Sequence, residues 1–244
     1  MSNRYVIAGL KVQMEPKFEL LKTRSEKYRF DFEGPADIIL KISEERFQFA
    51  RERHHGTSDE VIEYMSTGSM FYFGLLQFGG FLLHSSCISY NNKAYFFTAD
   101  SGTGKSTHTS LWQKYIDNVI MINDDKPAVR LIDGQFYAIG TPWSGKTAQN
   151  ADVTVSVGGV ALLYRSKTNS IRTALPNESV PFFMKQTILP YQSENTDRLA
   201  ELMDNFLRTV PVYHLECDMS EHAVKTSFEA MTNERYIAKG NKNG

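Results

Sequence analysis

A strand, a glycine-rich turn and a helix follow one another near the middle of the chain, and this order constrains the fold most. The β-prone segment 94–98 leads into ADSGTGKS at 99–106, and a segment with apolar residues on one side continues to residue 116. Gly102 and Gly104 allow the backbone to pass close to a ligand. Backbone N–H groups at the start of the helix would converge on phosphate there. The sequence therefore predicts an α/β fold built around a phosphate-binding loop.

A second stretch, GTPWSGKT at 140–147, fits the strict phosphate-loop pattern better, because the first one opens with alanine. Its context is unsuitable, since Pro142 has no N–H, Trp143 is bulky and residues 149–153 do not read as a helix. The first stretch is therefore the predicted nucleotide loop. Lys146 could neutralise charge on a transferred phosphoryl group. The alternative is a surface loop with a packed Trp143, and the sequence leaves both open.

Phosphate chemistry assigns roles to the residues of the first stretch. Lys105 would carry its charge to the β- and γ-phosphates of ATP, and the Ser106 hydroxyl would be a ligand of Mg²⁺. Backbone N–H groups would hold the phosphates. The predicted nucleotide-binding residues are Ser101, Gly102, Thr103, Gly104, Lys105, Ser106 and Thr107.

An apolar strand over residues 118–123 ends in two carboxylates, Asp124 and Asp125. Adjacent residues on a strand point in opposite directions, so one carboxylate can face Mg²⁺ while the other faces an acceptor. Phosphoryl transfer needs a metal ligand and a base within hydrogen-bond reach of the attacking hydroxyl. A polar turn before Pro127 is the alternative, but the position of the strand after the loop and its helix favours a functional pair. Which aspartate takes which role is left open.

Turn residues and apolar periodicity predict the remaining core. Two pairs of residues that tolerate positive φ predict hairpins: Asn91-Asn92, between segments 87–90 and 93–97, and Asp133-Gly134, between segments 129–132 and 135–139. Gly158-Gly159 interrupts a strand pattern over 153–165 as a turn or a bulge. Apolar stripes predict a helix that carries Leu199 to Leu207 and a last helix capped by Ser220.

The first part of the chain is expected to be rich in strands. Strands are predicted over 5–12, 36–42 and 46–51, and a helix begins at the capping box Thr57–Glu60. The expected organisation is a β-rich N-terminal region over residues 1–80 that packs on the core, a core over 81–235, and a disordered tail over 236–244.

An ordered set of motifs carries a resemblance to a known family. The segment Phe81 to His84, a hairpin, ADSGTGKS at 99–106 and the segment Asn123 to Asp125 resemble the catalytic domain of HPr kinase/phosphorylase, over about residues 80–175. The set is more distantly similar to phosphoenolpyruvate carboxykinases. The resemblance implies an ATP-dependent kinase core with a mixed, hairpin-containing sheet, an aspartate pair that acts as base and metal ligand, and a histidine near the pair.

His84 matches the position of that histidine. The alternative is a structural role, in which His84 is a core residue on a strand with its hydrogen bonds made inside the protein. The chain departs from the family in two respects. HPr kinases carry a longer, separate N-terminal domain, whereas only residues 1–83 precede His84 here. The family's glycine-rich second signature is replaced by the segment Thr141 to Lys146. A small-molecule hydroxyl acceptor therefore stays open beside a protein acceptor.

Composition excludes several other classes of protein. The 27 Lys and Arg residues nearly balance the 28 Asp and Glu residues, so no partner such as nucleic acid or an anionic membrane is expected. Apolar runs fall short of the roughly 20 residues that a membrane span needs, and no secretory signal opens the chain, so the cytoplasm is the expected compartment. Cys87 and Cys217 alone cannot form a disulfide framework or a four-ligand zinc site.

The sequence thus predicts a kinase that uses ATP and Mg²⁺ and transfers a phosphoryl group to a hydroxyl on a small molecule, peptide or protein. The predicted catalytic residues are His84, Asp124, Asp125 and Lys146, and the predicted metal ligands are Ser106, Asp124 and Asp125. The alternative is a nucleotide-binding regulatory module with little or no turnover. The acceptor is not identified, and a homo-oligomer is left open.

Overall fold

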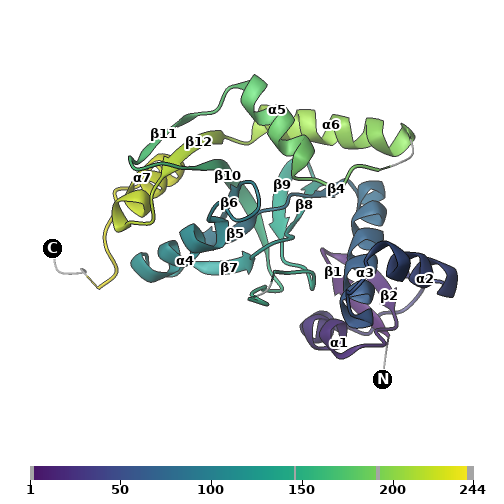
Figure 1. Ribbon diagram of the computed structural model, residues 1–244. Coiled ribbons are helices and arrows are strands. Elements are labelled where there is room, and N and C mark those ends of the chain that lie inside the picture. The colour runs from purple at the N-terminus through teal and green to yellow at the C-terminus, as the bar shows by residue number, and fades with distance from the viewer. Residues whose placement is uncertain (1–2, 146, 191–192, 241–244) are drawn as a thin grey trace.

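A nine-stranded mixed sheet forms the centre of the described part of the chain (Figure 1). The structure is a computed structural model that describes residues 3–145, 147–190 and 193–240. The strands lie in the order β4-β8-β9-β10-β6-β5-β7, with β12 beside β10 and β11 beside β12. Their bounds are β4 (Gly80–Leu82), β5 (Ser86–Tyr90), β6 (Lys93–Thr98), β7 (Ile120–Asn123), β8 (Ala128–Ile132), β9 (Gln135–Ile139), β10 (Thr154–Arg165), β11 (Ser170–Thr173) and β12 (Val212–Cys217).

The long strand β10 joins the two kinds of pairing in this sheet. It is parallel to β6 and to β12, and its first residues are antiparallel to β9. The register with β6 shifts between Val157 and Gly159, so the predicted interruption at Gly158-Gly159 is a bulge within one strand. This arrangement brings the carboxyl ends of β6 and β10 to the same edge of the sheet.

Both predicted hairpins are present. Asn91 and Asn92 have φ values of 46° and 57° between β5 and β6, and Asp133 and Gly134 have 49° and 79° between β8 and β9. Positive φ at both central residues is the geometry that lets a two-residue turn follow the twist of its strands. These local turns explain why the two hairpins of the sheet were predictable.

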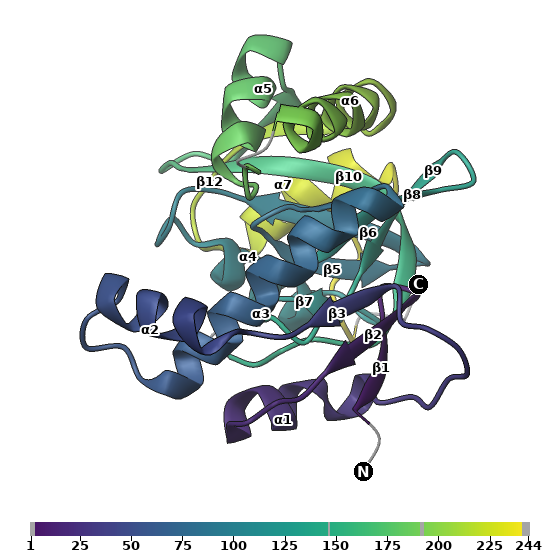
Figure 2. The same cartoon turned by 90° about the vertical axis from the view of Figure 1, so that its right-hand side faces the viewer.

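Helices cover both faces of the sheet (Figures 1 and 2). One face carries α4 (Lys105–Tyr115) and α7 (Glu221–Thr232), and the other carries α5 (Pro176–Lys185) and α6 (Ser193–Thr209). Alternate residues of β10 divide between the two layers. Val160 and Leu162 pack in a cluster with Phe206, whereas Ala161 and Leu163 pack in a cluster with Trp112. The predicted cap of α7 is also present, since the Ser220 side chain accepts a hydrogen bond from Ala223 N.

A small three-stranded sheet and three helices make up the N-terminal part of the described chain (Figure 2). Their bounds are β1 (Arg4–Ile7), β2 (Leu10–Met14), α1 (Glu19–Ser25), β3 (Ile38–Leu40), α2 (Glu44–Arg53) and α3 (Asp59–Leu75), with short 3₁₀ turns at Glu26–Tyr28 and Leu76–Phe78. Tyr5 and Phe71 from this part share one buried cluster with Ala128 and Ile139 of the large sheet. The small sheet therefore packs on the core through α3.

The predicted strand over residues 46–51 is wrong, because these residues lie in helix α2. The alternation of Phe47 and Phe49 with polar residues suggested a strand. The helix propensity of the glutamate and arginine residues in this segment outweighs that alternation. The Ser43 side chain also caps the helix by accepting a hydrogen bond from Arg46 N. None of the residues of α2 is buried, so packing on the core does not require apolar residues at helical spacing in this segment. The next helix, α3, has Ser58 rather than Thr57 as its N-cap residue.

The end of the described chain lies against α4 and α7. Tyr236 packs edge-to-face on Phe228, and Lys239 N donates to the carbonyl oxygen of Tyr115 at 2.8 Å. Residues 241–244, the last part of the tail expected to be disordered, lie outside the described residues. Within residues 3–145, 147–190 and 193–240, no helix combines the length and the apolar character that crossing a membrane requires.

Candidate functional site

The glycine-rich segment over residues 99–104 connects β6 to α4, as the sequence predicts, and is called the 99–104 loop below. Gly102 and Gly104 have φ values of 76° and 124°, in the region that favours glycine. A Cβ atom built on either residue would meet no atom within 4 Å. The backbone conformation, rather than crowding, therefore requires glycine, and the space beside the loop is open.

Lys105 begins α4 and reaches back across the loop. Its side chain is buried, and its Nζ donates to the carbonyl oxygen of Ala99 at 3.0 Å. Burial lowers the pKa of Lys105, while the nearby carboxylates of Asp125 and Asp100 act in the opposite direction. The cation is thus placed inside the curve of the loop and near Asp125.

The first N–H groups of α4 face the same region. The first backbone bond of the helix runs from His108 N to the Gly104 carbonyl oxygen at 2.9 Å, so the N–H groups of Lys105, Ser106 and Thr107 have no partner within the helix. The side chains of Ser106 and Thr107 are exposed. Free N–H groups and the positive end of the helix dipole favour an anion at this position.

Asp125 lies beside two cationic or hydrogen-bonding groups. His84 Nε2 and Asp125 Oδ1 are 3.0 Å apart, and Lys126 Nζ forms an ion pair with the other carboxylate oxygen. Burial alone would raise the pKa of Asp125, but the His84 hydrogen bond and the charge of Lys126 outweigh it and hold the pKa well below its usual range. Asp125 is therefore ionised at neutral pH.

His84 is held at this place by the sheet. It lies between β4 and β5, its N–H donates to the Gln186 carbonyl oxygen at 2.7 Å, and its carbonyl oxygen accepts from Thr98 Oγ1 at 2.8 Å. Thr98 is the last residue of β6, so this contact fixes His84 next to the start of the 99–104 loop. The His84 side chain is 35% exposed, which differs from the alternative of an enclosed core histidine.

Asp124 faces the opposite side, toward the chain that follows β9. Its Oδ1 accepts from Gly145 N at 2.5 Å, and its Oδ2 accepts from the Thr147 hydroxyl. Burial raises the pKa of Asp124, and the Gly145 hydrogen bond partly opposes this. The two neighbouring carboxylates thus point to different surroundings, and their pKa values shift in opposite directions.

Residues 140–144 of the second glycine stretch are buried in the core. Trp143 is completely buried, stacks on Phe71 with ring centroids 4.8 Å apart, and donates from Nε1 to Thr67 Oγ1 at 3.2 Å. Trp143 is therefore a packed residue, as the alternative expected, but residues 141–144 around it are buried rather than a surface loop. Lys146 lies outside the described residues.

Sequence reasoning missed Asn123, which joins the two sides of the site. Its Nδ2 donates to the carbonyl oxygens of Thr141 and Trp143 at 3.1 and 3.2 Å, and its Oδ1 accepts from Asp125 N and Lys126 N at 3.0 and 2.7 Å. The side chain is completely buried. A polar amide at the end of an apolar strand was the available signal, because a buried amide must find partners for both of its ends.

Gly145 is a second residue whose role sequence reasoning missed. A Cβ atom at this position would lie 3.0 Å from Asp124 Oδ2 and 3.2 Å from its Cγ. Any other residue would press against the carboxylate that Gly145 N holds. The glycine therefore permits the close approach of the backbone to Asp124.

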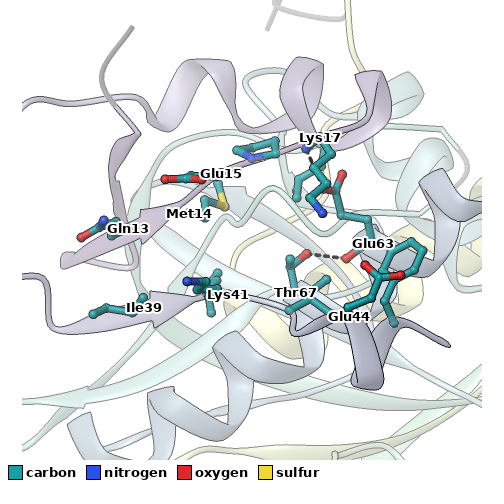
Figure 3. A pocket seen from close by; sticks show the side chains of 14 residues that line it. Gln13, Met14, Glu15, Lys17, Ile39, Lys41, Glu44, Glu63 and Thr67 are labelled. Atoms are coloured by element: carbon teal, nitrogen blue, oxygen red, sulfur yellow. Dashed lines mark hydrogen bonds between the residues drawn. The ribbon is translucent and has the colours of Figure 1, made fainter. Parts of the chain in front are cut away.

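The cavity drawn in Figure 3 lies in the N-terminal part of the chain. It has a volume of about 260 Å³ and lies between β2, β3, α2 and α3, with Lys17, Lys41 and Glu44 among its lining residues. At its inner wall, the Glu63 carboxylate accepts from Lys17 N at 2.6 Å, so this acid caps the segment before α1. Thr67 lines the cavity and also accepts from Trp143, but no residue of the 99–104 loop takes part.

Among known proteins, similarity is found only at the level of structure, and it is distant. A scan against protein-family models finds no match, and neither does a search of curated proteins. A search of solved structures finds the HPr(Ser) kinase/phosphatase from Coxiella burnetii, with a TM-score of 0.33 and 10% sequence identity over 62% of this chain and 93% of that one. At so low a similarity, evidence about function must come from the residues of the site.

Proposed function

We propose that this protein is an ATP-dependent phosphotransferase that transfers the γ-phosphoryl group of MgATP to a hydroxyl. The observation that carries the proposal is the placement of Lys105 and Asp125 together at the 99–104 loop. A glycine-rich turn without a ligand needs neither a buried lysine nor an ionised carboxylate beside it. A nucleotide site needs both, one for the phosphates and one for their metal.

The donor side would use the loop, Lys105, Ser106 and Asp125. Backbone N–H groups between Ser101 and Thr107, other than that of Thr103, and the Lys105 ammonium would hold the phosphates. The Ser106 hydroxyl and the Asp125 carboxylate would hold Mg²⁺. The described residues contain no group of three or more His, Cys, Asp or Glu side chains that could bind a metal by themselves. This fits Mg²⁺, which uses one or two carboxylates together with substrate phosphates. When bound, the metal neutralises charge on the phosphates.

The acceptor side would use Asp124. A raised pKa makes this carboxylate a better proton acceptor than an ordinary aspartate, and two neighbouring acids with pKa values moved apart are typical of divided roles. The Thr147 hydroxyl, on an exposed residue, already donates to Asp124. An acceptor hydroxyl would take its place. Lys146 stays a proposed partner for charge on the transferred group.

The proposed reaction balances with these groups alone. The bond between the γ-phosphorus and its bridging oxygen breaks, the bond from the acceptor oxygen to that phosphorus forms, and ADP leaves. The proton of the acceptor hydroxyl passes to the Asp124 carboxylate. His84 keeps Asp125 ionised through their hydrogen bond, which preserves its charge for the metal.

An acceptor screen tests the proposed function. The purified protein is incubated with γ-labelled ATP, Mg²⁺ and separate panels of amino acids, sugars, polyols and peptides, and transferred label is measured. We expect label on one class of hydroxyl compound. The label should be lost in Asp124→Asn and kept in Asp133→Asn, a matched change at the exposed β8–β9 turn. A protein that binds MgATP and labels no panel would support the regulatory module instead, because that role does not require Asp124.

A further inference from the structure

We propose that Arg165, the last residue of β10, is a positioning residue that orients the 99–104 loop for phosphate. Its Nε donates to the Thr103 carbonyl oxygen at 2.8 Å, and a terminal nitrogen of the same guanidinium donates to the carbonyl oxygen of Gly102. One side chain from a neighbouring strand thus holds two consecutive carbonyl groups of the loop. The inference rests on the function proposed above, because it assigns a role at the same nucleotide site.

The sheet register explains how Arg165 reaches the loop. Leu162 of β10 lies opposite Thr98 at the end of β6, so Arg165 extends beyond the end of β6 to the level of the loop. Side chains alternate along a strand, which places Arg165 on the same face as Ala161 and Leu163. Those two residues pack in the cluster beneath α4. The guanidinium therefore arrives at the side of the loop from which α4 begins.

The direction of a carbonyl group fixes the direction of the next N–H group. In a trans peptide, the C=O of one residue and the N–H of the following residue point in opposite directions. A hydrogen bond that holds the Thr103 carbonyl toward Arg165 therefore turns the Gly104 N–H away from Arg165. Thr103 N is already used inside the loop, since it donates to the Asp100 carbonyl oxygen at 3.2 Å. We infer that Arg165 keeps Gly104 N–H directed at the phosphates.

The planar fork of arginine suits this task better than a simple cation. A guanidinium presents several N–H donors in fixed directions, whereas a lysine ammonium is a point charge on a flexible chain. Arg165→Lys keeps the charge and loses the fork, and Arg165→Gln loses both. Arg208→Gln is a matched control, because Arg208 is another exposed arginine, paired with Asp204 on α6.

Calorimetry with MgATP and AMP, on wild type and the three variants, tests the assignment. Loss of one charge-assisted hydrogen bond weakens binding by roughly tenfold. We expect this loss of MgATP affinity in both Arg165 variants, a lower preference for MgATP over AMP, and unchanged urea unfolding midpoints. The turnover number at saturating MgATP should stay within about twofold, because orientation of the loop acts on donor binding. Arg208→Gln should behave as wild type.

Two results would overturn the assignment. If Arg165→Gln binds MgATP as wild type does, the contact has no role in binding. If Arg165→Lys restores full affinity, charge alone suffices and the carbonyl contacts do not orient the loop. An absence of MgATP binding by wild type and Arg208→Gln would be a different result, since it would overturn the proposed function itself.

Discussion

The side-chain amide of Asn123 donates a hydrogen bond to the carbonyl oxygen of Trp143 at 3.2 Å, and this contact ties the aspartate strand to the chain beyond β9. The same side chain accepts from the backbone of Asp125 and Lys126. One buried amide therefore holds the backbone of Asp125 next to the segment that contains Trp143. Replacing it changes the site without touching a residue proposed to contact substrate.

Asn123→Asp should lower both stability and transfer. The change keeps the shape of the side chain, removes the Nδ2 donor and brings a carboxylate next to two carbonyl oxygens. A buried polar group without a partner costs about 1–3 kcal/mol, and a charge costs more. Urea unfolding measures the loss, with the exposed Asn118→Asp as control. Equal unfolding midpoints for the two variants would show that the Asn123 contacts contribute nothing.

Trp143→Ala should destabilise the fold rather than open the reaction to water. Removing a completely buried tryptophan costs about 3–5 kcal/mol. Gly68→Ala should lower stability in the same region, because its Cβ would lie 2.8 Å from Trp143 Cδ1. Thermal unfolding and the ratio of released phosphate to transferred phosphate measure the two effects. A rise in that ratio with unchanged stability would instead place Trp143 at the reaction site.

Asp124→Asn and Asp125→Asn should have different kinetic effects. Asp125→Asn should raise the Mg²⁺ concentration needed for half-maximal activity, since the ionised carboxylate is the proposed metal ligand. Asp124→Asn should bind MgATP normally and slow transfer by about 10²–10⁴-fold, the usual contribution of a general base. Titration of Mg²⁺ and single-turnover transfer separate the roles. The reverse pattern would exchange the two assignments.

Acid should destabilise the protein partly through His108, a buried residue of α4. Burial lowers the pKa of His108 to about 4, and its Nε2 lies 2.9 Å from Ser227 Oγ. The unfolded chain, with a pKa of about 6.5, binds the proton first, so stability is full above that pH and falls as pH drops toward about 4. The pKa difference corresponds to about 3 kcal/mol.

Urea unfolding of wild type and His108→Asn between these pH values measures the effect. The free energy of unfolding should change less with pH in the variant than in wild type. Parallel profiles would exclude His108 as the source.

Local signals made much of the sheet and the 99–104 loop predictable. Asn91-Asn92 and Asp133-Gly134 specify their turns by themselves, and the strand and helix beside the loop have clear apolar patterns. Contacts between distant segments could not be predicted in this way. Helix α2 has no buried residue, so its sequence lacks the apolar spacing that identifies a helix. Trp143 packs against Phe71 of α3, which is far away in the sequence.

Strand alternation led to the expectation that the two aspartates point in different directions. Both lie in the bend after β7, however, so neither their backbone nor their surroundings follow from a strand pattern. His84 is the partner of Asp125 because Thr98 and Gln186 hold its backbone. Gly145 is the partner of Asp124 because the chain after β9 returns to the end of β7. Both arrangements depend on tertiary packing, which a single sequence does not display.

Calorimetry of MgATP binding to wild type, Lys105→Ala and Lys114→Ala tests directly whether the 99–104 loop binds the nucleotide. Lys114 is a matched control, because it is an exposed lysine on the same helix. Wild type and Lys114→Ala should bind MgATP alike, and Lys105→Ala should lose affinity by roughly 10- to 100-fold, the range for a lost charge-assisted contact. Equal affinity of Lys105→Ala and Lys114→Ala would contradict the assignment of the 99–104 loop as the nucleotide site.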